Sequence, residues 1–166
     1  MELKILITEE EIKKRIKTLA KDISEEFNGE KVTAICLLKG AFIFTADLVR
    51  EMKTEVEIEF MRIKSYEGTE KGEDKLIYNV ESDIEGKNVL IIDDILDTGG
   101  CLKTAVSVIK EKKPAKIKTC VLLEKERDKV IDADFVGFKI PDKFVVGYGL
   151  DMNELYRDLP YIAVVE

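Results

Sequence analysis

Mostly apolar runs of strand length alternate with helical patterns along this chain, and this alternation limits the possible fold more than any other feature. Val32–Leu38, Asn88–Ile92 and Lys116–Leu123 are such runs. A strand that is apolar throughout must be covered on both faces, as strands are in parallel sheets between helices. The sequence therefore predicts an α/β fold with a mainly parallel central sheet flanked by helices.

Helices are expected between these strands. Thr8 and Glu11 have the spacing of a capping box, and apolar residues follow a helical period from there to Phe27. A second helix is expected over residues 41–52, and a third from Leu102 onward. Residues 1–166 are expected to form a single domain, with a small hood lobe built from about residues 138–166 and the N-terminus.

Shorter strands and one long loop complete the expected organisation. The strands are Val56–Ile63, Leu76–Val80, Phe135–Phe138, Phe144–Gly147 and Tyr161–Val165. Seven of the twelve residues of Lys64–Lys75 are charged and two are glycine. This segment is expected to be a long flexible loop.

The composition excludes several classes of function. The chain has no histidine and a formal net charge of −7, so nucleophilic systems and metal sites that need histidine are ruled out. An acidic chain without a basic stripe is not expected to bind nucleic acid. No apolar run approaches the roughly 20 residues of a membrane span, and no signal peptide is recognised. We therefore expect a cytoplasmic protein without a membrane partner.

Three aspartates and two glycines follow the strand Asn88–Ile92. Asp93 and Asp94 come first, then Asp97, and Gly99-Gly100 precede the third helix. Glycines at a strand-to-helix turn expose successive backbone N–H groups, which can hold a phosphate together with the positive end of the helix. Taken by itself, an ordinary turn with capping residues explains this turn equally well.

The adjacent carboxylates of Asp93 and Asp94 favour a ligand site. They repel one another, and burying them without partners is costly. The two hydroxyls of a ribose would donate to such a pair, and Mg²⁺ prefers oxygen ligands of this kind. The pattern indicates a ribose-5-phosphate site, with an acidic pocket that binds only Mg²⁺ as the alternative.

Four segments resemble one known family. "VLIIDDILDTGGCL" resembles the phosphoribosyl-pyrophosphate signature of type I phosphoribosyltransferases, and three others resemble the hypoxanthine/guanine branch. "LLKGAFIFTADL" is similar to its pyrophosphate loop, "MRIKSYEGT" to its flexible catalytic loop and "DFVGFKIPDKFVVGYGLDMNELYRDLP" to its purine-binding segment. The resemblance runs from about Ile5 to the C-terminus and implies the type I phosphoribosyltransferase fold.

The resemblance also implies a role for each matched residue. Phosphoribosyl pyrophosphate would be bound by Leu38, Lys39, Gly40, Asp93, Asp94, Thr98, Gly99, Gly100, Cys101 and Arg157, often with a cis bond before Lys39. The purine would be bound by Lys125, Phe144, Val145 and Asp151. Mg²⁺ would be bound by Asp93, Asp94 and Asp151. Asp97 would be the general base at purine N7, and Ser65 and Tyr66 would belong to the flexible loop.

Several of these residues have a simpler interpretation. Core packing is an equal alternative for Phe144 and Val145, and solvated surface charge is an alternative for Lys125 and Arg157. The charges of the 64–75 loop would also suit a loop with no role in catalysis.

Two positions depart from the family pattern. Asp93 stands where glutamate is usual, and Cys101 stands where a threonine or serine hydroxyl usually contacts the phosphate. A thiol at a helix N-terminus can have a depressed pKa. We therefore expect Cys101 to be alkylated faster than Cys36 and Cys120, which lie in apolar runs and are expected in the core.

The expected activity is the joining of hypoxanthine or guanine to phosphoribosyl pyrophosphate, in a homodimer or homotetramer. A regulator that senses phosphoribosyl pyrophosphate and a xanthine-preferring or pyrimidine-specific transferase remain alternatives. The choice among hypoxanthine, guanine and xanthine depends on contacts at the C2 edge, around Val145 and Asp151.

Overall fold

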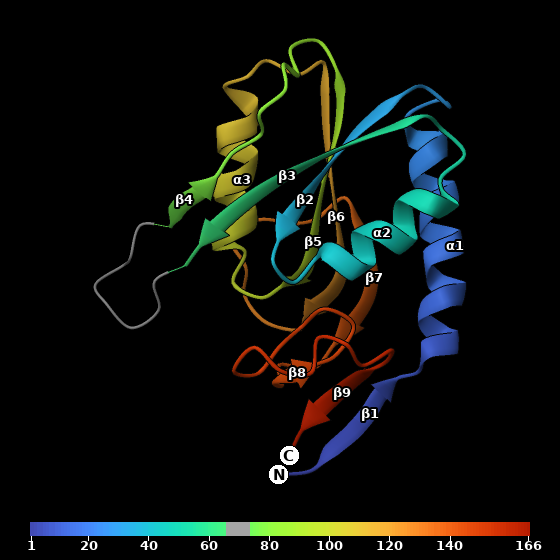
Figure 1. Ribbon diagram of the computed structural model, residues 1–166, viewed down its shortest axis with the longest axis vertical. Coiled ribbons are helices and arrows are strands. Elements are labelled where there is room, and N and C mark those ends of the chain that lie inside the picture. The colour runs from blue at the N-terminus through green and yellow to red at the C-terminus, as the bar shows by residue number, and fades with distance from the viewer. Residues whose placement is uncertain (66–73) are drawn as a thin grey trace.

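The computed structural model describes residues 1–65 and 74–166, and it arranges them around two sheets (Figure 1). The larger sheet has strand order β4-β3-β2-β5-β6-β7, and the smaller has β1-β9-β8. In the described ranges, no helix is long and apolar enough to cross a membrane.

The elements follow the expected alternation of strands and helices. The helices are α1 (Glu9–Glu26), α2 (Phe42–Glu51) and α3 (Gly100–Lys110). The strands of the larger sheet are β2 (Val32–Leu38), β3 (Val56–Lys64), β4 (Lys75–Tyr78), β5 (Asn88–Leu96), β6 (Lys116–Lys125) and β7 (Phe135–Ile140). Those of the smaller sheet are β1 (Leu3–Ile7), β8 (Val145–Val146) and β9 (Ile162–Val165).

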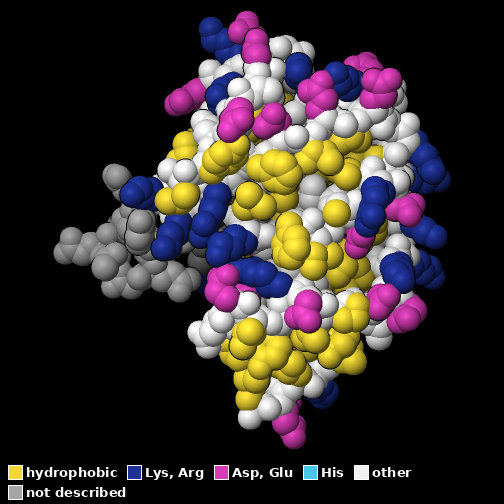
Figure 2. Space-filling model, viewed as in Figure 1, with side chains coloured by type: hydrophobic (Ala, Val, Ile, Leu, Met, Phe, Trp, Pro, Cys, Tyr) yellow, Lys and Arg dark blue, Asp and Glu magenta, His cyan; other side chains and the backbone are white. Residues whose placement is uncertain are grey.

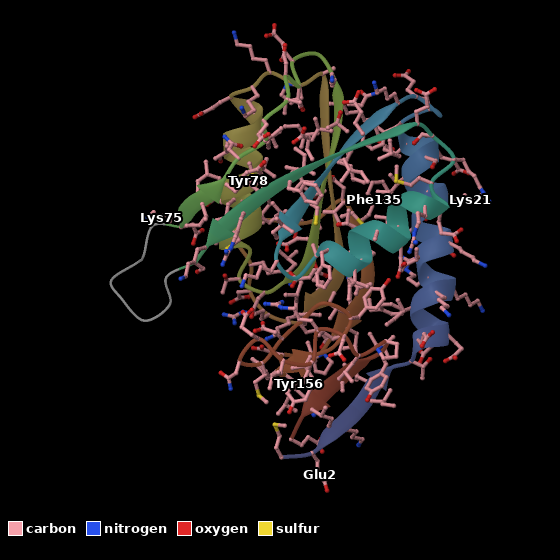
Figure 3. The ribbon with its side chains drawn as sticks, viewed as in Figure 1. Glu2, Lys21, Lys75, Tyr78, Phe135 and Tyr156 are labelled. Carbon is pink, nitrogen blue, oxygen red and sulfur yellow. The ribbon has the colours of Figure 1, made fainter. Side chains whose placement is uncertain are left out.

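The larger sheet is parallel except at one edge, which confirms the predicted fold class. β2 pairs in parallel with β3 and β5, and β6 with β5 and β7. β4 is antiparallel to β3 and forms the outer edge, where Lys75 and Tyr78 mark its ends (Figure 3).

Alternate residues of β5 belong to different cores because side chains of a strand point to opposite faces. Leu90 and Ile92 pack in the cluster that includes α1 and α2, whereas Val89 and Ile91 pack in the cluster that includes α3. All four are fully buried. Helices cover both faces of the sheet, as the continuous apolar runs predicted (Figure 1).

β5 is longer than the sequence predicted. Its apolar run ends at Ile92, yet the ladder with β6 continues through Asp93, Ile95 and Leu96. The prediction was wrong here because two carboxylates break the apolar pattern while the strand on either side of Asp94 still pairs with β6. Asp93 and Asp94 are therefore held by regular sheet structure rather than by a loop.

The smaller sheet joins the two ends of the chain. β1 pairs antiparallel with β9, and β9 pairs with β8. β1 was not predicted from the sequence, and its residues are mostly exposed or half-buried. β8 and β9 fall within the segment predicted to form the hood, and the division of the chain into one domain with a hood stays a prediction.

The predicted flexible loop lies largely outside the described residues. Lys64 ends β3 and Lys75 begins β4, so the loop is shorter than expected at both ends. Ser65 is described, whereas Tyr66 is not.

The N-terminus of α1 contains the predicted capping box. The Thr8 hydroxyl accepts a hydrogen bond from the Glu11 N–H at 3.2 Å, and the Glu11 carboxylate accepts one from the Thr8 N–H at 3.1 Å. α1 buries Ile12, Ile16 and Ile23 in one of the two cores. The capping box therefore stabilises the start of a helix that contributes many residues to that core.

We expect Thr8→Ala to lower the free energy of unfolding by about 1 kcal/mol, since it removes the cap and leaves an N–H group without its acceptor. Urea denaturation of the two proteins measures the difference. Thr18→Ala makes the same exchange at an exposed position of α1 and should leave stability nearly unchanged. Equal losses in the two variants would contradict a role of the capping box.

Candidate active site

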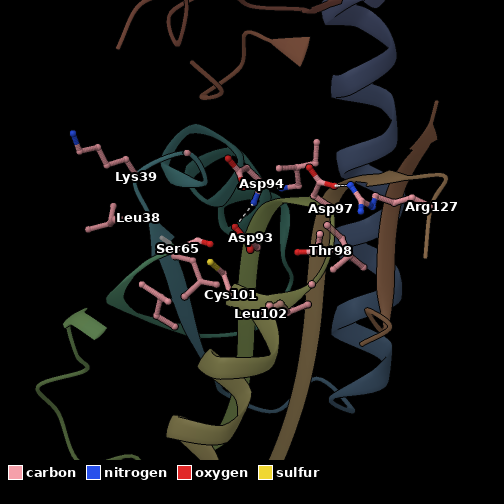
Figure 4. A pocket seen from close by; sticks show the side chains of 17 residues that line it. Leu38, Lys39, Ser65, Asp93, Asp94, Asp97, Thr98, Cys101, Leu102 and Arg127 are labelled. Carbon is pink, nitrogen blue, oxygen red and sulfur yellow. Dashed lines mark hydrogen bonds and ion pairs between the residues drawn. The ribbon is translucent and has the colours of Figure 1, made fainter. Parts of the chain in front are cut away.

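A cavity of about 360 Å³ lies where the carboxyl ends of β2 and β5 meet the start of α3 (Figure 4). Its lining comes from residues 37–40, residues 93–102, Ile63, Ser65 and Arg127. Parallel strands end at the same edge of a sheet, which is why segments so far apart in sequence meet there.

The turn between β5 and α3 forms one wall of the cavity. Gly99 is the N-cap of α3 and has φ +91°, a left-handed conformation that glycine adopts without steric cost. A Cβ atom at this position would lie 2.9 Å from Cγ2 of Ile131. Because glycine has no side chain to cap the helix, the first N–H groups of α3 are available to an anion.

Asp93 and Asp94 lie at the base of this wall. The Asp94 N–H donates to Asp93 Oδ1 at 2.8 Å, and the Ile95 N–H donates to Asp94 Oδ1 at 2.7 Å. Burial, and then the neighbouring charge of Asp94, raise the pKa of Asp93 well above its usual range. The pair therefore favours a ligand that brings hydroxyl donors or positive charge.

The loop at the end of β2 packs directly against this pair. The peptide bond between Leu38 and Lys39 is cis, as the resemblance implied. A Cβ at Gly40 would lie 1.9 Å from Asp94 Oδ2, and one at Gly149, whose φ is +102°, would lie 2.2 Å from the Gly40 carbonyl oxygen. Glycine is required at both positions because three stretches of backbone converge there.

A second hollow of about 260 Å³ adjoins the first and is rimmed by cations. The cations are Lys39, Arg62, Lys64 and Arg157, and Lys and Arg side chains gather on this surface near the end of β3 (Figure 2). Arg157 is 19% exposed and donates to the Gly149 carbonyl at 2.7 Å. The interpretation of Arg157 as solvated surface charge is therefore wrong.

The same hollow contains the carboxylates that balance these cations. Lys39 Nζ lies 3.0 Å from Glu154, and Arg157 Nη2 lies 3.2 Å from Glu154 and 3.5 Å from Asp151. Asp151 also accepts the Glu154 N–H at 2.9 Å. Glu154 is an acidic member of this group that was not predicted from the sequence.

Asp97 lies on the opposite side of the first cavity and is held by two cations. Lys125 Nζ is 3.2 Å from Asp97 Oδ2, and Arg127 Nη1 is 2.9 Å from Asp97 Oδ1. Lys125 is the last residue of β6 and is only 12% exposed, so it is not a solvated surface charge. Arg127 was missed, although its position two residues after a strand end pointed to this edge.

Two of the purine residues implied by the resemblance, Phe144 and Val145, are not in the described lining of this cavity. Val145 is buried at 4% exposure, as a core residue would be, whereas Phe144 is 53% exposed. Core packing is therefore the wrong interpretation of Phe144.

Cys101 does not have the depressed pKa that the sequence suggested. Burial, followed by the negative charges of Asp74, Asp93 and Asp94, raises the pKa of its thiol to about 12. Two of these carboxylates, Asp93 and Asp94, lie in β5, and Asp74 directly precedes β4. Cys36 and Cys120 are fully buried, as predicted.

Comparison with known proteins identifies the family. The phosphoribosyl transferase domain model matches residues 4–153. The chain belongs to the phosphoribosyltransferase family. The hypoxanthine-guanine phosphoribosyltransferase of Aquifex aeolicus (strain VF5) is 49% identical over 99% of this chain and 95% of its own length. That of Bacillus subtilis (strain 168) is 44% identical over 98% and 93%.

Solved phosphoribosyltransferases share the fold as well. The crystal structure of a hypoxanthine-guanine phosphoribosyltransferase from Bacillus anthracis superimposes with a TM-score of 0.94 at 41% identity, covering 99% of this chain and all of that one. The Trypanosoma cruzi hypoxanthine phosphoribosyltransferase with the product IMP gives 0.90 at 39% identity, covering 98% and 94%. The chain has the type I phosphoribosyltransferase fold.

We expect Cys101 to react slowly with iodoacetamide at pH 8, because a pKa of about 12 leaves roughly one thiol in 10⁴ ionised at that pH. Its rate should rise steadily from pH 8 to pH 10, as mass spectrometry of the labelled peptide can measure. The protein unfolded in guanidinium is the control, in which all three cysteines should react alike and faster. A Cys101 rate that levels off below pH 8 would contradict this assignment.

Proposed function

We propose that this phosphoribosyltransferase transfers the 5-phosphoribosyl group of phosphoribosyl pyrophosphate to hypoxanthine or guanine, in purine salvage. Pyrophosphate and the nucleoside 5′-monophosphate, IMP or GMP, are the products. The relatives named above are hypoxanthine or hypoxanthine-guanine phosphoribosyltransferases. The observation that carries the proposal is the carboxylate pair Asp93–Asp94 beside the exposed N–H groups of the α3 turn.

The ribose and its 5′-phosphate fit this arrangement. The vicinal hydroxyls supply the donors that the repelling carboxylates of Asp93 and Asp94 need. The N–H groups that begin at Gly99 meet the phosphate at the positive end of α3. The thiol of Cys101 is a weak donor, so the backbone carries this contact.

The pyrophosphate fits the cation-rimmed hollow. Lys39 and Gly40 would present backbone N–H groups, and Arg157 would face the leaving group with a charge that Asp151 and Glu154 balance in the free protein. When pyrophosphate binds there, its oxygens would replace carboxylate partners of these cations. The net charge of −7 therefore does not oppose the substrate locally.

Asp97 is the proposed general base. As N9 of the purine bonds to C1′ and pyrophosphate leaves, Asp97 would take the proton from N7. Lys125 would donate to the 6-oxo oxygen, which distinguishes oxopurines from adenine because an ammonium has no acceptor for an amino group. Phe144 would stack on the base, and the Val145 backbone would meet its C2 edge.

Mg²⁺ fits the donors at this site. Burial, and then the charge of Asp94, raise the pKa of Asp93, so a bound cation would stabilise its charged form, and Asp94 and Asp151 add carboxylate oxygens. No group of three such side chains close enough to hold a metal occurs in the described part of the chain, so oxygens of the substrate would complete the shell, as is usual for Mg²⁺. Bound Mg²⁺ would neutralise part of the pyrophosphate charge.

Three features remain predictions. Ser65 and Tyr66 would belong to a loop that excludes water from the reacting sugar. A homodimer or homotetramer and a cytoplasmic location are expected as before.

The proposed activity has a direct test. We expect the protein with phosphoribosyl pyrophosphate and Mg²⁺ to convert hypoxanthine, guanine or both to the nucleotide, as chromatography of the products would show. Adenine should give no nucleotide because Lys125 offers only donors. Formation of no nucleotide from any oxopurine would contradict the proposal.

We expect Asp97→Asn to lower kcat by about 10²–10⁴-fold, because the amide keeps the shape of the side chain but cannot take a proton. The affinity for phosphoribosyl pyrophosphate, measured by calorimetry, should not change. Asp22→Asn makes the same exchange at an exposed position of α1 and serves as the control. A normal kcat in the Asp97→Asn protein would show that another group is the base.

A further inference from the structure

The segment that follows β6 is fixed against the turn that carries Asp97. The Val130 N–H donates to the Thr98 carbonyl at 3.0 Å, and Ile131 packs against Gly99 so closely that a Cβ there would meet it at 2.9 Å. This segment therefore has a defined position relative to the proposed base. Arg127 lies at its start.

The two cations divide the carboxylate of Asp97 between them. Arg127 Nη1 donates to Oδ1 at 2.9 Å (Figure 4). Lys125 Nζ lies 3.2 Å from Oδ2. Both oxygens are thus engaged in the free protein. Because each nearby cation stabilises the charged form of the carboxylate, Asp97 takes a proton from a purine more readily once one cation has moved away.

Asp142 gives both cations a second partner. It lies 3.6 Å from Lys125 Nζ and 3.9 Å from Arg127 Nη1. Two carboxylates, Asp97 and Asp142, and two cations, Lys125 and Arg127, thus form a network without net charge at the edge of the cavity. Lys125, which is only 12% exposed, can release Asp97 without becoming an unpaired buried cation, whose cost would be high.

We propose that Arg127 is a positioning residue that holds Asp97 Oδ1 throughout, so that Oδ2 points at purine N7 once Lys125 has turned to the 6-oxo oxygen. This inference rests on the role of Asp97 in the proposed function. Arg127 is suited to the fixed position because its segment is tied to the Thr98 turn. Lys125 is suited to the exchange because the purine oxygen and Asp142 both offer it an acceptor.

Arg127 also lines the cavity itself, so direct binding of the donor phosphate is the competing role. The two roles differ in what they do to kinetics. A residue that aims the base affects kcat, whereas a residue that binds the donor in its ground state affects KM for the donor. The effect on kcat of a residue that only aims the base must also vanish when the base itself has been removed.

The test compares Arg127→Met with the unaltered enzyme. Methionine keeps the alkyl stem but cannot donate, and we expect kcat to fall by about 10²-fold with KM for phosphoribosyl pyrophosphate unchanged. Arg127→Lys should recover most of the loss, since one N–H donor reaches one oxygen. Arg50→Met is the matched control, because Arg50 also donates to an aspartate, Asp47, but lies on α2.

A double variant decides whether Arg127 acts through Asp97. In the Asp97→Asn protein, adding Arg127→Met should cause no further loss of kcat. A further loss as large as in the unaltered enzyme would overturn the proposal. So would a raised KM for the donor with kcat unchanged, which would make Arg127 a phosphate ligand.

A crystal structure of the ligand-free Arg127→Met protein separates this inference from the proposed function. The Asp97 carboxylate should leave its present position, whether or not the protein makes nucleotide. A carboxylate that stays in place would overturn the positioning role. Absence of nucleotide formation by the unaltered protein would instead refute the proposed function alone.

Discussion

The repulsion between Asp93 and Asp94 is the constraint on which the rest of the site depends. Regular pairing with β6 holds them side by side at the end of a buried strand, and burial raises the pKa of Asp93. Backbone N–H groups satisfy one oxygen of each, and the remaining need for donors is the chemical basis of sugar binding. Gly40 follows from the same constraint, because only a residue without Cβ fits against Asp94.

Two ion-pair networks flank this pair and explain how an acidic protein can present cations to a polyanion. Arg157 pairs with Asp151 and Glu154 on one side, and Asp97 pairs with Lys125 and Arg127 on the other. Each cation already has a carboxylate partner, so a ligand replaces an existing interaction. Because folding has already ordered these charged side chains and removed part of their water, ligand binding has less desolvation and reordering left to do.

Some elements were readable from the sequence because their signal is local. β2 matches its apolar run residue for residue, and α1 begins at its capping box. β1 was missed because its apolar run, Ile5–Ile7, is only three residues long. Its partner β9 lies at the other end of the chain. The end of β5 was missed because backbone pairing does not require apolar side chains.

The same division holds within the site. The sequence by itself determined which chemistry is present: adjacent carboxylates, a glycine turn before a helix, and no histidine, since these depend on residue type and short spacing. Only the tertiary structure decided the partners. Arg127 reaches Asp97 across 30 positions, and Cys101 has a raised pKa because it is buried and because carboxylates of other segments lie near it. Electrostatic interactions act through space, and distances in space are set by packing rather than by order along the chain.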